Sequence, residues 1–361
     1  MKNVVIAAYY RSPLTPAHKG SLKTVRADEM AGQVIKELVK KTKVDPAKIE
    51  DLIMGCAFPE GEQGFNIARL VCFLAGLPKS VAGCTLNRFC GSSMQAIHNA
   101  AGMIQMGAGD AFICAGMENM SRTPMTGFNP MPHPGLFEKM PEAYMGMGET
   151  AENVVDKYKL TREEMDEFAA LSHKKAAKAR EAGNFKDEII PIQDGNRTIS
   201  EDECIRPETT AEGLGGLKPA FKEDGSVTAG TSSPLTDGVC AVLVCSEDFA
   251  KENKLKPLAR IKSIAVAGCD PEIMGIGPVP AAKKALEKEG WIAEIVSPKS
   301  GSIKAWASTD WGKLYPVDKT IDEVHFSDYN ALLLPGGVIN PDQLRTNEKA
   351  LEFVKAFFEA G

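Results

Sequence analysis

The stretch from which the fold can be worked out is residues 83–106, GCTLNRFCGSSMQAIHNAAGMIQM. Residues 83–89 predict a short buried strand, and the residues after Cys90 predict an amphipathic helix that ends at about residue 106. The expected inner face of this helix consists of Met94, Ile97, Ala101 and Ile104. A strand that passes through a tight turn into a helix is a building unit of α/β proteins, so we expect a sheet covered by helices.

The same alternation of strand and helix patterns continues on both sides of this stretch. Apolar runs predict strands at residues 3–8, 51–56, 110–115, 241–246 and 259–266, and helical patterns occur at residues 28–41, 65–77 and 278–286. The sequence therefore predicts an α/β fold.

Residues 121–230 interrupt this alternation and read as an inserted, largely irregular region. The region begins with a segment rich in Pro, Gly and Met. A long helix follows at residues 161–182, opened by a capping box of Thr161 and Glu164. Gly183 is expected to end that helix, because glycine is favoured just after a helix C-terminus.

Cys90 is the strongest candidate for a catalytic residue. It lies where the expected helix begins, and the free N–H groups and dipole of a helix N-terminus favour a thiolate. A thiolate accepts an acyl group from a thioester at little energetic cost, because one thioester replaces another. The alternative is a structural cysteine at the end of a buried strand. The other eight cysteines are interpreted as core or surface thiols.

The segment NRFCGSSMQA around Cys90 resembles the acyl-accepting cysteine motif of thiolases. Further segments resemble thiolase sequence in the same order along residues 1–286: VVIAAYYRSP, EQGFNIAR, DAFICAGMENMS, MGETAENV, IRPETT, LKPAF, SVTAGTSSPLTDG and CDPEIMGIGPVPA. The likeness is greatest to degradative 3-ketoacyl-CoA thiolases of the bacterial fatty-acid oxidation complex. It implies acetyl-CoA C-acyltransferase activity in fatty-acid β-oxidation, in which Cys90 carries the acyl group as a thioester while CoA cleaves 3-ketoacyl-CoA and acetyl-CoA is released.

By the same resemblance, coenzyme A binds on the inserted region. Arg206 of IRPETT matches a position near the nucleotide, and an arginine can hold a phosphate. Phe221 of LKPAF, with Ala229 and Ser233 of TAGTSS, matches positions that line the pantetheine channel. The alternatives are that Arg206 forms a surface ion pair and that Phe221 is a core residue. The basic run at residues 173–180 is interpreted as a solvated helix face. Coenzyme A enters as a substrate, and neither a permanently bound cofactor nor a metal is implied.

The composition changes towards the end of the chain. All 15 methionines lie at or before Met274, all nine cysteines at or before Cys269, and all three tryptophans after residue 290. From about Ala285 the sequence, with ALEKEGWIAEIVSPKSG and LLLPGGVINPDQLR, resembles PfpI-type intracellular proteases and their glutamine-amidotransferase-like relatives. This resemblance covers only part of that family's pattern and implies no complete catalytic site of its own.

The two resemblances divide the chain into four expected parts. They are residues 1–120 with 231–257 as a thiolase-like N-terminal α/β repeat, 121–230 as the inserted loop domain on the CoA side, 258–286 as the start of a second repeat, and 287–361 as a partial PfpI-like α/β segment. Within the last part we expect short strands at residues 292–296 and 331–334, separated by polar loops, and a helix at residues 347–359.

The second repeat is interpreted as truncated. None of the five histidines follows a glycine and no cysteine follows Cys269, so the Gly-His-Pro histidine and CxG cysteine of the family pattern are missing. Loss of one general acid or base typically lowers the rate by about 10²–10⁴-fold, so we expect impaired or absent turnover. His98 lies eight residues beyond Cys90, about 12 Å along a helix, and is interpreted as structural. The alternatives to a thiolase are a non-catalytic fusion or misassembled chain, and a PfpI-type hydrolase.

The overall composition argues against several function classes. The 361 residues carry a net charge of −6, which is unlike a general nucleic-acid binder. No apolar run approaches the ~20 residues that span a bilayer, and the N-terminus shows no signal-peptide pattern. Nine cysteines without a CxxC pair suit a reducing cytoplasm. We therefore expect a cytoplasmic enzyme whose partners are acyl-CoA and CoA, with a homo-oligomer or a fatty-acid oxidation complex partner left open.

Overall fold

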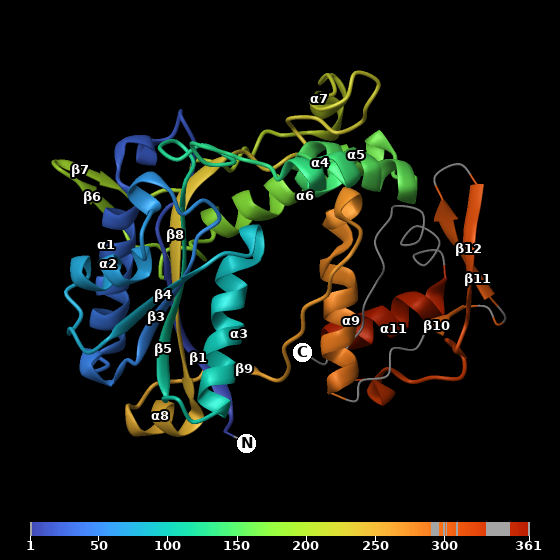
Figure 1. The fold of residues 1–361 in the computed structure, drawn as a ribbon. Coiled ribbons are helices and arrows are strands. Elements are labelled where there is room, and N and C mark those ends of the chain that lie inside the picture. Colours follow the sequence, from blue (N-terminus) through green and yellow to red (C-terminus); the bar gives the residue numbers. More distant parts are fainter. Residues whose placement is uncertain are drawn as a thin grey trace. The chain divides into compact units, whose positions relative to one another are not determined.

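The computed structural model describes residues 2–289, 296–298, 300, 302–307, 310–329 and 347–359 (Figure 1). They belong to two compact units. Unit 1 comprises Met1–Pro134, His173–Glu208 and Ser233–Ile264, and unit 2 comprises Gly135–Ser172, Thr209–Ser232 and Ala265–Gly361.

A mixed sheet organises unit 1. Its strands follow the order β4 (Ala82–Leu86), β3 (Asp51–Gly55), β5 (Ala111–Asn119), β8 (Thr236–Ser246), β1 (Val4–Arg11) and β9 (Ala259–Ile261), and β2 (Thr15–Pro16) pairs with β8. Strand β3 is parallel to β4 and β5, whereas β8 is antiparallel to β5 and β1. Helices join the parallel strands, as parallel neighbours require. The α/β fold expected from the sequence is confirmed.

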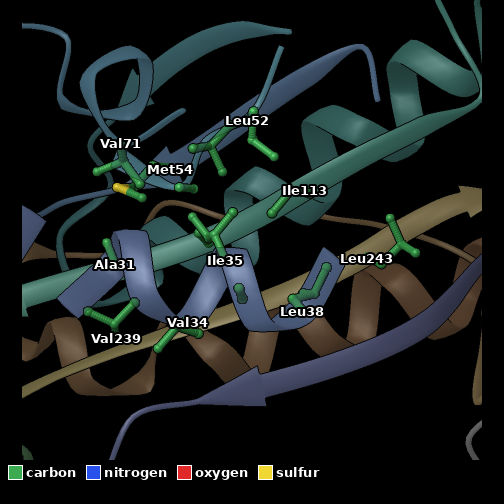
Figure 2. Close-up of a cluster of buried hydrophobic side chains, with 14 of the residues drawn as sticks. Ala31, Val34, Ile35, Leu38, Leu52, Met54, Val71, Ile113, Val239 and Leu243 are labelled. Carbon is green, nitrogen blue, oxygen red and sulfur yellow. The ribbon is translucent and has the colours of Figure 1, made fainter. Parts of the chain in front are cut away.

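Helices cover both faces of this sheet. Helices α1 (Ala27–Thr42) and α2 (Ile67–Leu74) pack on one face, and α3 (Ser92–Gln105) packs on the other (Figure 1). On α1, Val34, Ile35 and Leu38 are fully buried and belong to one cluster with apolar side chains of β3, β5 and β8 (Figure 2). Burial of each such side chain contributes about 1.5–3 kcal/mol. A short helix, α8 (Glu247–Glu252), follows β8.

The expected inner face of α3 is partly wrong. Met94 is 63% exposed, and the buried residues of the helix include Ala96, Ala100, Ala101 and Ile104. Small side chains form this face because the helix lies close to the sheet. At its first turn α3 passes over Gly55 of β3 and Gly116 of β5, where a Cβ atom would stand 2.6 Å and 2.7 Å from the Cβ atoms of Ser92 and Ser93. The large Met94 side chain does not fit that contact and points to solvent.

Other boundaries differ by a few residues for local reasons. The helix expected at residues 65–77 is α2, Ile67–Leu74. It ends before Gly76, because a residue with a φ of +73° cannot continue an α-helix. The helix expected at residues 161–182 is confirmed as α6 (Arg162–Glu181). Its capping box is formed as expected, because Thr161 N–H donates to Glu164 Oε2 at 2.8 Å and Glu164 N–H donates to Thr161 Oγ1 at 3.2 Å.

Part of the region between β5 and β8 is tied to the sheet of unit 1. Arg11 at the end of β1 forms ion pairs of 2.7 Å with both Glu188 and Asp202. A small hairpin of β6 (Ile192–Asp194) and β7 (Arg197–Ile199) lies between these two acidic residues in the sequence.

Unit 2 is built mainly from helices and short strands. Its elements are α4 (Pro134–Lys139), α5 (Met147–Tyr158), the first part of α6, α7 (Ala211–Gly215), α9 (Pro278–Lys288), β10 (Val296–Ser297), β11 (Ser302–Ala307), β12 (Asp310–Pro316), β13 (Lys319–Thr320) and α11 (Glu348–Glu359). Strands β11 and β12 pair antiparallel, where we expected polar loops. That expectation was wrong because the two segments pair along the backbone, with residue 306 opposite residue 311, and neither segment shows this pairing by itself.

The last helix expected from the sequence is confirmed as α11. Of the strand expected at residues 292–296, only residue 296 is described, in β10, and the strand expected at residues 331–334 lies outside the described residues. Among the helices that the structure describes, none is both long and apolar enough to cross a membrane.

Candidate active site

Cys90 lies exposed in a 3-10 turn, Phe89–Gly91, between the end of β4 and the start of α3. The strand was expected to reach residue 89 but ends at Leu86, because the chain turns at Phe89. Phe89 has a φ of +43°, a left-handed conformation that a bulky residue rarely adopts. Asn87 Oδ1 accepts the Phe89 N–H at 2.7 Å, and Ser92 Oγ donates to the Phe89 carbonyl at 2.6 Å. These side-chain hydrogen bonds hold the turn that presents the Cys90 thiol.

The loop after β3 supports this turn from the side. Asn87 Nδ2 donates to the Ala57 carbonyl at 2.8 Å, and the Phe58 and Phe89 rings lie 6.1 Å apart at 56°. The sequence analysis did not single out Ala57 or Phe58, because they carry no catalytic chemistry. Only the parallel pairing of β3 with β4 brings their loop beside Cys90.

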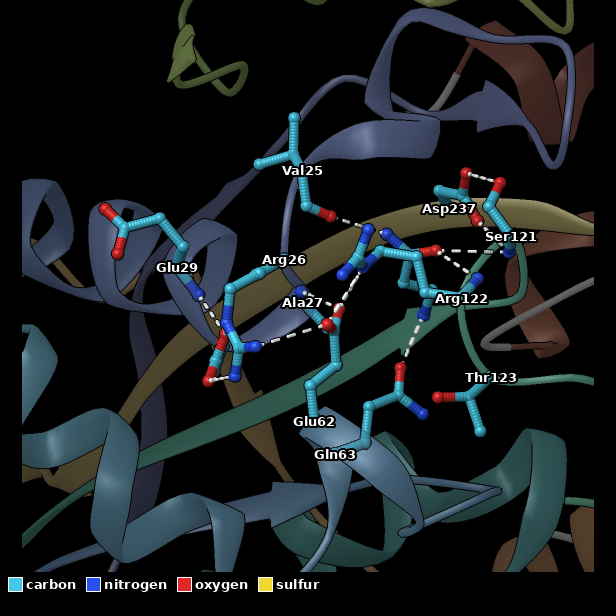
Figure 3. Close-up of polar contacts among 12 residues, drawn as sticks. Val25, Arg26, Ala27, Glu29, Glu62, Gln63, Ser121, Arg122, Thr123 and Asp237 are labelled. Atoms are coloured by element: carbon cyan, nitrogen blue, oxygen red, sulfur yellow. Dashed lines mark hydrogen bonds and ion pairs between the residues drawn. The ribbon is translucent and has the colours of Figure 1, made fainter. Parts of the chain in front are cut away.

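A polar network that is hydrogen-bonded to this loop contains two residues that the sequence analysis also missed, Glu118 and Gln63. Gln63 is fully buried, donates to Glu118 Oε1 at 2.9 Å and accepts the Asn119 N–H at 2.6 Å. Next to Gln63, Glu62 pairs with Arg122 at 2.8 Å and accepts the Ala27 N–H at 3.1 Å (Figure 3). Burial raises the pKa of Glu118, while the N–H donors around it act in the opposite direction.

Several of the other thiols are poor nucleophiles at neutral pH because burial raises their pKa. The pKa of Cys72 rises to about 11 and that of Cys245 to about 12. The pKa of Cys56 rises to about 12, mainly through burial and secondarily through the nearby Glu118 carboxylate. Cys114 is 2% exposed and its pKa is raised by burial as well. These four thiols act as core residues, as the sequence analysis expected, whereas Cys90 faces solvent.

His98 does not share the turn with Cys90. It lies in the second turn of α3, and burial, followed by the positive charge of Arg88, lowers its pKa. The imidazole is therefore neutral at physiological pH. The described residues contain no group of three or more His, Cys, Asp or Glu side chains that could hold a metal ion.

The four residues matched to the CoA site are exposed and are divided between the units. Arg206 and Ser233 belong to unit 1, and Phe221 and Ala229 belong to unit 2. Within the described part of the chain, the Arg206 side chain forms no ion pair, and its backbone N–H donates to His173 Nδ1 at 3.2 Å. Phe221 is 45% exposed, so it is not a core residue. Both alternatives weighed for these positions are therefore disfavoured.

Helix α5 positions the CoA-matched segments of unit 2. Phe221 packs against Gly148 so closely that a Cβ atom there would lie 2.0 Å from Phe221 Cδ1. Glu152 is buried and accepts the N–H groups of Ser226 at 3.0 Å and Val227 at 2.8 Å, just before Ala229. The sequence analysis quoted MGETAENV only as a family segment, and a buried carboxylate that binds backbone N–H groups has no local sequence signal.

Three family descriptions match parts of this chain. The family described as "Thiolase, N-terminal domain" matches residues 4–248, "Thiolase, C-terminal domain" matches residues 255–297, and "DJ-1/PfpI family" matches residues 278–361. The 3-ketoacyl-CoA thiolase of Idiomarina loihiensis is 47% identical over 297 residues, which cover 80% of this chain and 76% of the relative. That of Bacillus subtilis is 46% identical over 303 residues, with 80% and 78% covered.

Solved structures are similar over the same part of the chain. The Bacillus anthracis acetyl-CoA acetyltransferase has a TM-score of 0.73 at 43% identity and covers 82% of this chain and 79% of its own. Human mitochondrial 3-ketoacyl-CoA thiolase in complex with CoA has a TM-score of 0.73 at 36% identity, with 82% and 78% covered. Together with the thiolase-type match over residues 4–248 around the exposed Cys90, these likenesses show that the chain belongs to the thiolase family of acyltransferases and continues into a DJ-1/PfpI-type segment.

Proposed function

We propose that this chain is an acetyl-CoA C-acyltransferase of fatty-acid β-oxidation that acts on 3-ketoacyl-CoA and uses Cys90 as its nucleophile, and that its turnover is impaired or absent because the histidine and the second cysteine of the family pattern are missing. The observation that carries the proposal is the exposed Cys90 thiol, held in a strained turn at the start of α3, within the part of the chain that matches the thiolase family. A fixed, accessible thiol at the end of a strand suits covalent acyl transfer.

The acylation step needs a nucleophile that attacks the C3 ketone of the substrate and a proton for the departing carbanion. The Cys90 sulfur attacks the C3 carbonyl of 3-ketoacyl-CoA and forms an S–C bond. The C2–C3 bond breaks and its electron pair stays on C2 of the departing acetyl-CoA. The Cys90 thiol gives up its proton to water and C2 takes up one from water, because the second cysteine of the family pattern is missing. The acyl group then passes from Cys90 to the sulfur of a second CoA, which loses its thiol proton and regenerates the free thiol.

The binding roles of the four matched residues belong to the same proposal. Arg206 lies near the CoA nucleotide, and its guanidinium, which forms no ion pair with any described residue, suits a phosphate. Phe221, Ala229 and Ser233 line the path of the pantetheine arm, and the support of α5 beneath Phe221 and Ala229 favours this role. Coenzyme A is thus a substrate, as in the human relative whose complex with CoA has been solved.

The finer organisation is also proposed. Residues 1–120 with 231–257 form the thiolase N-terminal repeat, 121–230 the inserted domain, 258–286 the start of a second repeat and 287–361 the PfpI-like segment. The overlap of the thiolase and DJ-1/PfpI matches at residues 278–297 supports a junction in α9 or shortly after it. We place the chain in the cytoplasm, as a homo-oligomer or with a partner of the fatty-acid oxidation complex.

Trapping the acyl-enzyme tests the proposal. The protein is incubated with acetyl-CoA, quenched in acid and mapped by peptide mass spectrometry, with Cys90→Ala and Cys84→Ala as matched variants. We expect one acetyl group on the Cys90 peptide, sensitive to hydroxylamine, in the wild type and in Cys84→Ala but not in Cys90→Ala. Acetylation spread over several cysteines, or absent from Cys90 in folded protein, contradicts the proposal.

A further inference from the structure

Glu118 is a partly buried carboxylate near the end of β5 that the acyl-transfer steps do not use. Its Oε2 accepts the Ala57 N–H at 2.7 Å, and its Oε1 accepts the Phe58 N–H at 3.3 Å and Gln63 Nε2 at 2.9 Å. The Cys56 thiol lies 3.8 Å from Oε1. A carboxylate in this position binds two consecutive backbone N–H groups of the loop after β3, and hydrogen bonds to a charged acceptor are about twice as strong as neutral ones.

The same loop is bonded to the turn that presents Cys90. The peptide unit between Ala57 and Phe58 donates its N–H to Glu118, and its carbonyl accepts from Asn87 Nδ2 at 2.8 Å. Asn87 Oδ1 in turn accepts the Phe89 N–H at 2.7 Å. Hydrogen bonds at the two ends of one peptide unit polarise and strengthen each other. Glu118 is therefore linked to the residue before Cys90 by one continuous chain of hydrogen bonds.

The series of hydrogen bonds from Glu118 ends at Phe89, whose backbone conformation is strained. Phe89 holds a left-handed φ of +43°, and such a conformation costs of order 1–3 kcal/mol unless its surroundings enforce it. The Phe89 N–H is bonded through Asn87, and its ring packs beside the Phe58 ring at 6.1 Å. The Phe58 ring belongs to the loop that Glu118 holds, and Asn87 is bonded to the Ala57 carbonyl of that loop, so both supports depend on it.

We propose that Glu118 is a positioning residue for Cys90, which acts through the Ala57–Phe58 peptide and Asn87 to hold Phe89 in the turn that presents the thiol. This inference rests on the proposed role of Cys90 as the nucleophile. The hydrogen bonds of Glu118 go to Cys56, Ala57, Phe58 and Gln63, and none of them reaches the Cys90 thiol.

The rate of alkylation of Cys90 measures this positioning without any need for turnover. Folded protein reacts with limiting iodoacetamide, and the rate at Cys90 is read by peptide mapping in the wild type, Glu118→Gln, Asn87→Ala and the double variant. Glu118→Gln keeps the size of the side chain but turns an NH₂ group towards the backbone donors. We expect each single variant to lower the rate by about tenfold, and the double variant to be no slower than either, because coupled neighbours are non-additive.

Glu62→Gln is the matched control. Glu62 has a side chain that is 8% exposed and pairs with Arg122, but it bonds neither Ala57 nor Phe58. This variant loses a buried carboxylate of the same network and should react at Cys90 at the wild-type rate even where urea unfolds it earlier. A role of Glu118 in stability alone predicts that Glu118→Gln behaves like Glu62→Gln.

The proposal is overturned if Glu118→Gln alkylates at the wild-type rate, or if its effect multiplies with that of Asn87→Ala. Should Glu118→Gln not fold, Asn87→Ala decides, because Asn87 is exposed and we expect its substitution to leave the core intact. An unchanged rate in that variant also overturns the proposal. Slowed alkylation in both single variants of a chain that forms no acyl-enzyme would support the inference while refuting the proposed function.

Discussion

Replacing Gly55 by alanine should push the start of α3 away from the sheet. A Cβ atom at this position would stand 2.5 Å from the Ser92 carbonyl carbon and 2.6 Å from the Ser93 nitrogen. Carbon atoms in contact normally lie about 3.5–4.0 Å apart, so the helix must retreat by about 1 Å. The clash is with backbone atoms, and no side-chain rotation relieves it.

The expected loss of stability follows from two opposing effects. Overpacking of this kind costs about 1–3 kcal/mol. Alanine recovers about 0.5–1 kcal/mol, because it loses less conformational entropy than glycine on folding. We therefore expect a net destabilisation between about 0 and 2.5 kcal/mol, with a central value of roughly 1 kcal/mol. The displaced Ser92 hydroxyl would also lose its hydrogen bond to the Phe89 carbonyl, so alkylation of Cys90 should slow as well.

Equilibrium urea denaturation measures this difference, with Gly102→Ala as the control. Gly102 lies within α3, and beyond its chain neighbours and the backbone of its own helix nothing lies within 4 Å of a Cβ built there. The same substitution should therefore stabilise the protein by about 0.5–1 kcal/mol. If Gly55→Ala unfolds at the same urea concentration as the wild type and reacts normally at Cys90, the close approach of α3 to the sheet does not determine the conformation of the Phe89–Gly91 turn. That result would refute the prediction.

Three further predictions concern separate parts of the chain. Limiting iodoacetamide should label Cys90 before Cys84, whose pKa is raised chiefly by burial, and before Cys114, which is 2% exposed; equal labelling of all three would indicate an unfolded chain. Burial also raises the pKa of Asp51 in the folded protein. The protonated Asp51 carboxyl therefore favours folding below its ordinary pKa of about 3.9, and this contribution is lost as the pH rises through the pKa of the folded state. Asp51→Asn should accordingly gain urea resistance relative to the wild type between pH 4 and pH 7, and a pH-independent difference would contradict this assignment. Glu152→Gln should destabilise the protein by about 1–2 kcal/mol, because the charged acceptor of the Ser226 and Val227 N–H groups is lost, and an unchanged unfolding midpoint would show that this loop holds without it.

Much of the fold follows from local sequence patterns. Apolar residues at helical spacing in α1, the capping box of Thr161 and Glu164, and the turn between β4 and α3 are all visible in short windows of sequence. Cys90 stands out for the same reason, because its position at a strand-to-helix turn is encoded within ten residues. The turn alone does not show which reaction Cys90 performs, and the resemblance to thiolases indicates acyl transfer.

Errors arose where a partner distant in the sequence decides the outcome. Met94 fits the helical period but is exposed. The start of α3 lies so close to Gly55 and Gly116 of the sheet that a large side chain does not fit between them. The β11–β12 hairpin depends on backbone pairing between two segments, which neither segment shows alone.

The sequence by itself determined the α/β class, the family and the identity of the exposed cysteine, because each rests on residues that are neighbours along the chain. Only the tertiary structure decided how that cysteine is held. Glu118, Ala57 and Asn87 come from β5, from the loop after β3 and from the turn after β4, and no motif joins them. Hydrogen bonds between such residues depend on strand order, which brings β3 between β4 and β5. Strand order is settled by packing of the whole sheet, and local spacing carries no record of it.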